Sequence, residues 1–535
     1  MQVPQPEAPS EHEAAGYARE LRRWRELRGL SMRALAELMA YDRSYVSHIE
    51  GCNQPPTEHF TRRAEEVLNA GGALWGQWEA LTTARALTVD GESPVSSREL
   101  RTAEFVAWLA DHSASSFREA YDAVAAQAHR LDAESPSALS DRGHERARVT
   151  RAQVADAIAT YYQGMPDGDD RRHRLYRARV DGVELALSVL VEPSWLGAAV
   201  QLGTLQERVR FRAPSTEPTT QLGDAARHAA IARLAEVEVA ETVMMNNPLY
   251  RLLDVDIGPQ RLAATVTLAD FASYALTADL LESELVDALT ATATGDDADI
   301  RTPLRDIYLP STAAATALDE RECVGGPATL LAIARPARGG RPADYVLLIQ
   351  ERSSRVVNVT GKLAVIPKAF HQPMSEPAEE VDLLATVERE LEEELLGRQD
   401  LEQLDPQSYR RADPLHEHLR SEPMAWLTDR RDRDACRVEC TGFGINLVTG
   451  NYEFACLAVI DDDQWWHQYG YLVEANWETT RVHRFSSRDT DALAALAGDP
   501  RWSNEGLFAF LEGLRRLAQL DTSGRVAAPP IDVEV

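Results

Sequence analysis

The segment from residue 31 to residue 50, SMRALAELMAYDRSYVSHIE, restricts the possible folds more than any other part of the sequence. Ser31 stands directly before a run whose apolar residues recur at helical spacing, namely Leu35, Ala36 and Met39. A serine hydroxyl in this place accepts hydrogen bonds from the free N–H groups of a first helical turn. The pattern therefore predicts a helix from about residue 32 to residue 39.

A second short helix is predicted from Arg43 to Glu50, after a tight turn at residues 40 and 41 and an N-cap at Asp42. In this helix Val46 and Ile49 would point to the core. Four side chains would then face outward: Arg43, Ser44, Ser47 and His48. Two capped helices joined by a tight turn indicate a helix-turn-helix whose second helix enters the major groove of DNA. These four residues are the candidate DNA-binding residues.

This stretch resembles the Cro and phage-repressor (XRE-like) helix-turn-helix family. The matching positions are Leu35, Ala36, Val46, Ile49, the pair Glu50-Gly51 and the pair Pro55-Pro56. Ala40 stands where the family prefers glycine, and Met32 where it often has glutamine. The resemblance implies a transcription regulator that binds double-stranded DNA. A small helical bundle with a solvated arginine face remains the alternative.

Charge favours a local DNA-binding patch rather than a generally basic protein. The formal net charge of the chain is -29, which repels nucleic acid as a whole. Arginines nevertheless crowd the first helices, at positions 19, 22, 23, 25, 28, 33 and 43. Phosphate contacts from such side chains supply much of the affinity of a DNA-binding protein.

Cysteine usage and hydropathy indicate a cytoplasmic protein. The 5 cysteines are few and scattered, as expected in a reducing compartment. Cys436 and Cys440, preceded by His416 and His418, form a zinc candidate that their spacing disfavours. The sequence has neither an apolar run of roughly 18 residues nor the pattern of a signal peptide. We therefore expect no membrane association.

Composition and periodicity divide the chain into seven segments. In order they are a disordered tail (1–12), the helix-turn-helix domain (13–85), a linker (86–97), a helical segment (98–163), an α+β domain of unknown role (164–300), a strand-rich domain (310–520) and a second tail (521–535). The helical segment could carry the contacts of a homodimer, which readers of paired half-sites need, or could be a spacer. Both alternatives stay open.

The α+β segment begins with a predicted hairpin. Strands at 176–180 and 183–191 are joined by Asp181-Gly182, a strong turn signal. Helices at 224–244 and 269–289 follow, with a strand at 262–268 between them.

The strand-rich segment contains a highly charged helix. The predicted order is strands at 345–349 and 361–367, a helix at 385–396, strands at 442–448, 452–460 and 481–485, and a helix at 505–517. On the first helix Glu390, Glu393 and Glu394 share one face because they are spaced i, i+3 and i+4. Three carboxylates on one face favour a divalent cation such as Mg²⁺.

This helix resembles the signature helix of the Nudix family. Arg389, Glu390, Leu391, Glu393 and Glu394 match in register. The resemblance implies an α/β/α Nudix-like domain in which Glu390, Glu393 and Glu394 bind metal and Arg389 orients the helix. Glu393 and Glu394 would be catalytic if the site is active. The whole chain is thus expected to be multidomain, with an all-α head, a helical spacer, an α+β middle domain and this C-terminal domain.

Three positions depart from the Nudix pattern. Leu396 replaces the glycine at the end of the helix, Pro367-Lys368-Ala369 replaces a Pro-Gly-Gly turn, and Val381 stands in place of an upstream glutamate. These changes would reshape the backbone that holds a pyrophosphate, so the resemblance predicts the fold better than it predicts hydrolysis.

The only two lysines of the chain, Lys362 and Lys368, lie just before this helix, beside His371. A lysine ammonium suits a phosphate or carboxylate. We expect these residues, with Arg389, to hold an anionic ligand; the alternative is an exposed loop without a function. The sequence as a whole predicts a DNA-binding regulator that senses a small phosphorylated or nucleotide-type ligand. The alternative is a Mg²⁺-dependent Nudix hydrolase of a nucleoside diphosphate derivative that carries a DNA-binding head.

Overall fold

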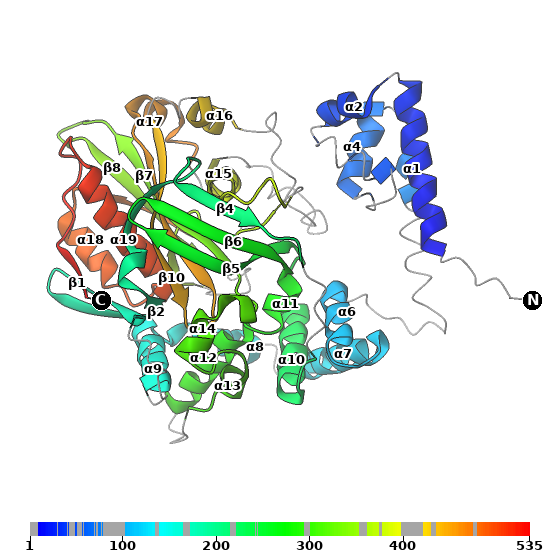
Figure 1. The fold of residues 1–535 in the computed structure, drawn as a ribbon, viewed down its shortest axis with the longest axis horizontal. Helices are drawn as coiled ribbons and strands as arrows, with labels where there is room; N and C mark the ends of the chain where they lie inside the picture. The colour runs from blue at the N-terminus through cyan, green and yellow to red at the C-terminus, as the bar shows by residue number, and fades with distance from the viewer. Residues whose placement is uncertain are drawn as a thin grey trace, which may run out of the picture. The chain divides into compact units, whose positions relative to one another are not determined.

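The computed structural model divides the chain into two compact units (Figure 1). One comprises residues 1–99 with 404–420, and the other residues 100–403 with 421–535. We call them the N-terminal unit and the C-terminal unit and describe each by itself. The structure describes residues 9–28, 30–39, 41, 46, 49–50, 56, 58–68, 70, 73–75, 77–78, 102–133, 138–163, 172–214, 221–240, 242, 244–293, 300–352, 361–373, 377–396, 421–429, 435–473 and 479–534.

The N-terminal unit is helical. Its helices are α1 (Pro9–Leu27), α2 (Met32–Met39) and α4 (Glu58–Leu68). Val46, Ile49 and Glu50 are also helical. Helix α1 begins inside the stretch 1–12 that we predicted to be a disordered tail, because Pro9 suits the first turn of a helix.

Ten strands of the C-terminal unit form one mixed sheet. Along the sheet the order is β12 (Thr479–Ser486), β8 (Asp344–Arg352), β7 (Gly325–Arg335), β11 (Tyr452–Ile460), β10 (Cys436–Asn446), β2 (Val183–Val191), β1 (Arg174–Val180) and β13 (Ile531–Glu534). Strand β3 (Leu196–Gln201) also pairs with β10, and β9 (Leu363–Val365) with β8. The neighbouring strands β7 and β11 are parallel, and the other pairs are antiparallel.

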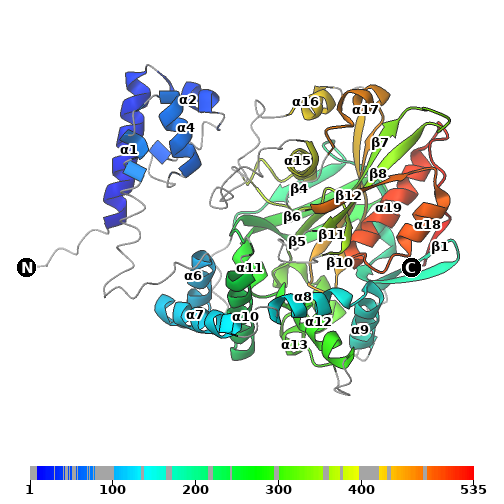
Figure 2. The same ribbon diagram turned by 180° about the vertical axis from the view of Figure 1, so that it is seen from behind.

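The strands β7 and β11 separate two hydrophobic cores. In β7, Leu330 and Ala332 face the core formed with α19 (Asn504–Leu520) and α18 (Thr490–Ala497), whereas Leu331 and Ile333 face the other core. This alternation follows from the two-residue period of a strand. Since both faces of β7 and β11 are covered, these strands lie in the interior of the unit. Helices α18 and α19 lie side by side in Figures 1 and 2.

The second core contains a smaller sheet and most of the helices. Its strands are β4 (Glu207–Phe211), β6 (Arg261–Asp270) and β5 (Pro248–Gly258), in that order. The helices before the large sheet's β7 are α6 (Ala103–Asp111), α7 (Phe117–Ala133), α8 (Ala138–Arg148), α9 (Arg151–Gln163), α10 (Asp224–Ala240), α11 (Phe271–Ala275), α12 (Leu280–Ala293), α13 (Pro303–Tyr308) and α14 (Thr312–Thr316), with short 3-10 turns at Pro193–Trp195 and Leu318–Glu320. The helices after it are α15 (Leu383–Leu391), continued by a π-helical turn at Glu392–Leu396, α16 (Glu422–Asp429) and α17 (Asp463–Tyr469).

The predicted hairpin is present. Strands β1 and β2 pair directly, and Asp181 and Gly182 both have positive φ angles, 48° and 81°. A two-residue turn of this kind needs that backbone conformation at both positions, which Asp-Gly adopts readily.

The boundary drawn near residue 300 does not separate two folding units. Strands β2 and β3, from the segment predicted to be an independent α+β domain, pair with β10 in the large sheet. The segment 521–535, predicted to be a tail, contains β13, which pairs with β1. Pairing between strands so distant in the sequence leaves no local pattern, so the boundaries could not be placed correctly.

Most predicted helices and strands of this unit are confirmed, but one predicted helix is interrupted, and several strands, β3, β4, β5 and β7 among them, were not predicted. The helix expected at 269–289 is interrupted, because β6 continues to Asp270 and two helices, α11 and α12, follow. Strand β7 was not predicted. It begins with Gly325 and Gly326, where an added Cβ would lie 1.8 Å from the carbonyl oxygen of Tyr452 and 2.2 Å from that of Ala369. The glycines are needed because the backbone passes there too closely for a side chain.

Candidate functional site

A small closed core holds the helices of the N-terminal unit together. Leu35, Ala36 and Met39 of α2 are buried against Val46 and Ile49, as the sequence predicts. The core is completed by residues of α1 and α4, among them Tyr17, Leu21, Phe60 and Leu68. The Tyr17 hydroxyl is 2.9 Å from Oγ1 of Thr61, so the interior carries a satisfied polar pair.

The beginning and the end of α2 are fixed by backbone hydrogen bonds. Ser31 Oγ accepts a hydrogen bond from the Ala34 amide at 3.1 Å, which confirms the predicted N-cap. After the helix, the Tyr41 amide donates to the Ala36 carbonyl at 2.9 Å, and the Tyr41 ring is buried against Phe60. The chain therefore turns immediately after α2, as a helix-turn-helix requires.

A buried ion pair ties α1 to Glu50. Arg25 donates from Nε to Glu50 Oε1 at 2.5 Å and from Nη2 to Oε2 at 2.8 Å. Arg22 Nε adds a third contact to the same carboxylate at 3.2 Å. Because the Arg25 guanidinium is buried in this ion pair, it does not belong to the basic surface that the sequence suggested.

Other arginines of the unit are exposed and can reach a phosphate backbone. They are Arg19, Arg22, Arg23, Arg28, Arg33 and Arg62. Arg28 is held in place by a 2.6 Å hydrogen bond from Nε to the Leu68 carbonyl. A group of cations on so acidic a chain gives the local electrostatic footprint that DNA binding needs.

The four predicted DNA-binding residues, Arg43, Ser44, Ser47 and His48, lie outside the described residues. Asp42, the predicted second N-cap, and Ala40 also lie outside them. The sequence alone assigns these residues to the turn and second helix around Tyr41, Val46 and Ile49.

Comparison with known proteins identifies this unit. Residues 17–76 match the family model of a helix-turn-helix domain. The matched residues contain α2, α4 and most of α1, together with the buried positions that the sequence assigned to the core. No curated protein matches the chain. We refer to the unit below as the helix-turn-helix unit.

The predicted carboxylate helix is α15 with its π-helical continuation. Its apolar face, Leu383, Val387 and Leu391, is buried in the core opposite α19. The N-terminus is fixed from β4, because Glu207 Oε1 accepts a hydrogen bond from the Leu383 amide at 2.6 Å. Burial raises the pKa of Glu207 to about 7. Sequence analysis missed Glu207, since 176 residues separate it from Leu383.

The carboxylates of this helix do not all face solvent. Glu390 and Glu393 are partly exposed, whereas Glu394 is buried. The neighbouring Glu392 is also buried and accepts hydrogen bonds from the amide and the hydroxyl of Ser421, both at 2.8 Å. Among the described residues, which include Glu390, Glu393 and Glu394, no three acidic, histidine or cysteine side chains form a group that could hold a metal ion. A site at this helix would need a ligand that supplies part of the coordination.

The side chains of Arg389, which belongs to this helix, and of His371 are both buried. Arg389 donates to the Gln372 carbonyl at 3.3 Å and lies 3.5 Å from Oε1 of Glu390. Burial lowers the pKa of His371 to about 3, and the nearby Arg389 acts in the same direction. His371 Nδ1 is 3.4 Å from the hydroxyl of Tyr452.

The two lysines contact different partners. Lys362 Nζ donates to the Val149 carbonyl at 2.5 Å and to the Ala147 carbonyl at 3.4 Å, at the C-terminal end of α8. A cation there interacts favourably with the last carbonyls of a helix. Lys368 Nζ is 2.7 Å from Oε1 of Glu505 in α19. The structure therefore does not bring the two ammonium groups together at the carboxylate helix, as the sequence suggested.

Lys368 belongs to a buried polar cluster that the sequence did not predict. Burial alone would raise the pKa of Glu505, but the Lys368 ammonium holds it below the usual value. Burial raises the pKa of Glu453 to about 8 and that of Glu282 to about 7. Asn446 Nδ2 donates to the other oxygen of Glu505 at 3.5 Å. These residues come from four segments that are distant in the sequence. Sequence analysis singled out one of them, Lys368, because lysine is rare in this chain.

The cysteines of the zinc candidate lie on β10. Cys440 is buried opposite Cys456 of β11, and Cys436 is partly buried. His416 and His418 lie outside the described residues. No helix in the described parts of the chain is long and apolar enough to cross a membrane.

Proposed function

We propose that the protein is a sequence-specific transcription regulator of the XRE-like type. The observation that carries the proposal is the helix-turn-helix match over residues 17–76, on a unit whose α2 is capped by Ser31 and packed on Val46 and Ile49. In such a unit the helix after the turn lies in the major groove, and its outward side chains contact base edges. We assign this role to Arg43, Ser44, Ser47 and His48.

The experiment is recovery of fragmented genomic DNA by the full-length protein, followed by sequencing and titration of the recovered site. Arg43→Ala and Ser47→Ala should each weaken binding to that site by about 1–3 kcal/mol, the contribution of a good base contact. Arg118→Ala, an exposed arginine on α7, is the matched control and should bind as the unsubstituted protein does. Unchanged retention in the Arg43 and Ser47 variants would overturn the assignment of the recognition face.

A homodimer on paired half-sites is part of the proposal. Dimeric readers of this type bind two half-sites about 34–36 Å apart, so the recovered site should be an inverted repeat. A single half-site, with a monomer in sedimentation, would exclude the dimer.

For the C-terminal unit we propose a Nudix-like sensor of a small phosphorylated ligand. Support comes from the mixed sheet with the carboxylate helix α15 against one core and α19 against the other. In this proposal the partly exposed Glu390 and Glu393 would meet a Mg²⁺ ion carried by the ligand. Lys362 and Lys368 are not part of the proposed ligand site, because Lys362 contacts the end of α8 and Lys368 contacts Glu505.

The test is titration of the protein with Mg²⁺ and a panel of nucleoside diphosphate derivatives. Binding that is weakened by Glu393→Gln and is not followed by turnover supports the sensor. Turnover that is lost in the Glu393→Gln and Glu394→Gln variants would support a Nudix-type hydrolase instead.

A further inference from the structure

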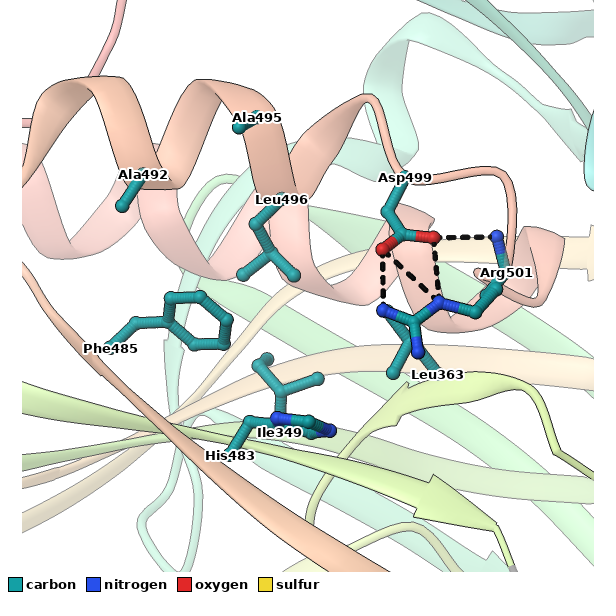
Figure 3. Close-up of a pocket in the computed structure, with 9 residues that line it drawn as sticks. All are labelled: Ile349, Leu363, His483, Phe485, Ala492, Ala495, Leu496, Asp499 and Arg501. Carbon is teal, nitrogen blue, oxygen red and sulfur yellow. Dashed lines mark hydrogen bonds and ion pairs between the residues drawn. The ribbon is translucent and has the colours of Figure 1, made fainter.

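A cavity of about 300 Å³ lies beside the core around α19 (Figure 3). Helix α18 forms one wall, and strands β8, β9 and β12 form the other. The apolar lining comes from Ile349, Leu363, Phe485 and Leu496. These side chains belong to the core around α19, whereas α15 packs in the other core. The cavity is therefore separate from any site at the carboxylate helix.

One end of the cavity is polar. Asp499 and Arg501 lie there, and Phe485 and Ala492 lie on the side away from Arg501 (Figure 3). The Arg501 amide donates to Asp499 at 2.9 Å, and its guanidinium donates from Nη2 at 2.7 Å. His483 also lines the cavity, with Nε2 3.4 Å from Oε2 of Glu351. The cavity thus has an apolar part and a hydrogen-bonding part, as small-molecule sites usually have.

The charges at the polar end favour a cation. Asp499 lines the cavity, and Glu351, which does not line it, has Oε2 3.6 Å from Nη1 of Arg501, so two carboxylates meet one guanidinium. The carboxylates of this group outnumber its guanidinium. An anionic ligand would also meet the repulsion of a chain with a formal net charge of -29.

We propose that this cavity binds an organic amine with a short apolar body. Its ammonium group would lie near Glu351 and Asp499, and its hydrocarbon part would fill the space between Phe485 and Leu496. A volume of about 300 Å³ is at the lower end of the range for small-molecule pockets, which fits a ligand with a short body. The proposal concerns the C-terminal unit alone and does not depend on DNA binding.

The first test is calorimetric titration of the full-length protein with n-alkylamines from propylamine to heptylamine. Affinity should rise about fourfold with each methylene until the cavity is full, because each buried methylene adds a constant increment. Hexanol and hexanoate, which have the same body but no positive charge, should bind more weakly than hexylamine. Affinity that does not depend on chain length, absence of amine binding, or a preference for hexanoate would overturn the proposal.

Two substitutions test the two ends of the cavity. Ala492→Leu adds three carbon atoms at the apolar end and should shorten the best-bound amine by about two methylenes. Glu351→Gln should weaken hexylamine binding about fivefold, the upper range for a partly exposed ion pair. Asp491→Asn, an exposed carboxylate on the same helix as Ala492, is the control. An equal loss in the Asp491 variant, or an unchanged chain-length optimum in the Ala492 variant, would contradict the assignment.

Discussion

Arg25 and Glu50 join the first helix of the helix-turn-helix unit to the end of its recognition segment. Both side chains are buried, and two nitrogens of the guanidinium meet two oxygens of the carboxylate. The same guanidinium donates to the Leu30 carbonyl at 3.0 Å, so it also fixes the loop before α2. This pair fixes Glu50, which follows the proposed base-contacting residues in the sequence, to α1.

Arg25→Ala should destabilise the helix-turn-helix unit by about 3 kcal/mol, because it removes one partner of a buried ion pair. Arg23→Ala, two residues away, removes an exposed pair with Glu20 and should cost less than about 1 kcal/mol. Hydrogen exchange of the amides of α1 and α2 in the full-length protein measures both effects. Equal exchange in the two variants would contradict the larger contribution to stability that we assign to the buried pair.

Lys368→Met should destabilise the C-terminal unit at neutral pH, because Glu505 would stay buried without its cation. In the unsubstituted protein the folded-state pKa of Glu505 is lowered, so its contribution is present above the unfolded pKa and is lost on acidification. The variant should therefore lose about 3 kcal/mol at pH 7 and less at pH 4. Denaturant unfolding at the two pH values measures the difference.

The second substitution Glu505→Gln in the Lys368→Met background should recover most of the lost stability, since the buried charge disappears. Lys362→Met, whose ammonium donates to the Ala147 and Val149 carbonyls and does not pair with Glu505, is the control and should lose less stability at pH 7 than Lys368→Met. A failure of the double variant to recover would contradict the assigned pairing.

Glu207→Gln should change how stability depends on pH. The folded-state pKa of Glu207 is raised to about 7, so its contribution is present below the unfolded pKa and is lost as the pH rises through 7. Between pH 4.5 and 8 the unsubstituted protein should lose on the order of 3 kcal/mol more than the Glu207→Gln variant. Glu184→Gln, at an exposed position of β2, should leave the pH dependence as it is. Parallel curves for the Glu207→Gln variant and the unsubstituted protein would exclude the raised pKa.

Ending the chain at Ala528 should reduce the stability of the C-terminal unit and promote self-association. It removes β13, uncovers the edge of β1, and removes Ile531 and Val533 from the core around α19. Thermal unfolding and light scattering measure the two effects. Ending the chain at Glu534 instead keeps the strand and should change neither quantity.

The sequence predicted local features well and long-range pairing poorly. Asp181-Gly182 fixes a hairpin by backbone preference alone, and the bounds of β11 were predicted because Tyr452–Ile460 is apolar except for Glu453 and lies between turns. Strand β7 is buried on both faces, so it lacks the alternation that marks a half-exposed strand. Nothing near β10 shows that it pairs with β2, about 250 residues earlier.

For the candidate sites, too, the sequence predicted local patterns but not distant partners. The pattern around Ser31 was sufficient for the helix-turn-helix because its cap and core lie within one short segment. The lysines were singled out correctly as unusual, but their partners, Val149 and Glu505, are 213 and 137 residues away. A cation in a loop carries no information about which distant group it meets, so the predicted anion site could not be placed from sequence.

The pairing of β13 with β1 has a consequence for the order in which the protein is made. Arg179 and its ion-pair partner Glu534 are separated by 355 residues. At ordinary rates of synthesis, roughly 20 s or more passes between completion of residues 17–76, which match the helix-turn-helix model, and completion of the last strand. During that interval residues 17–76 can already fold, whereas the β1–β2 hairpin has an unpaired edge. The nascent chain therefore gains its DNA-binding part before its sheet is closed, and β1 is the place where a chaperone would protect it.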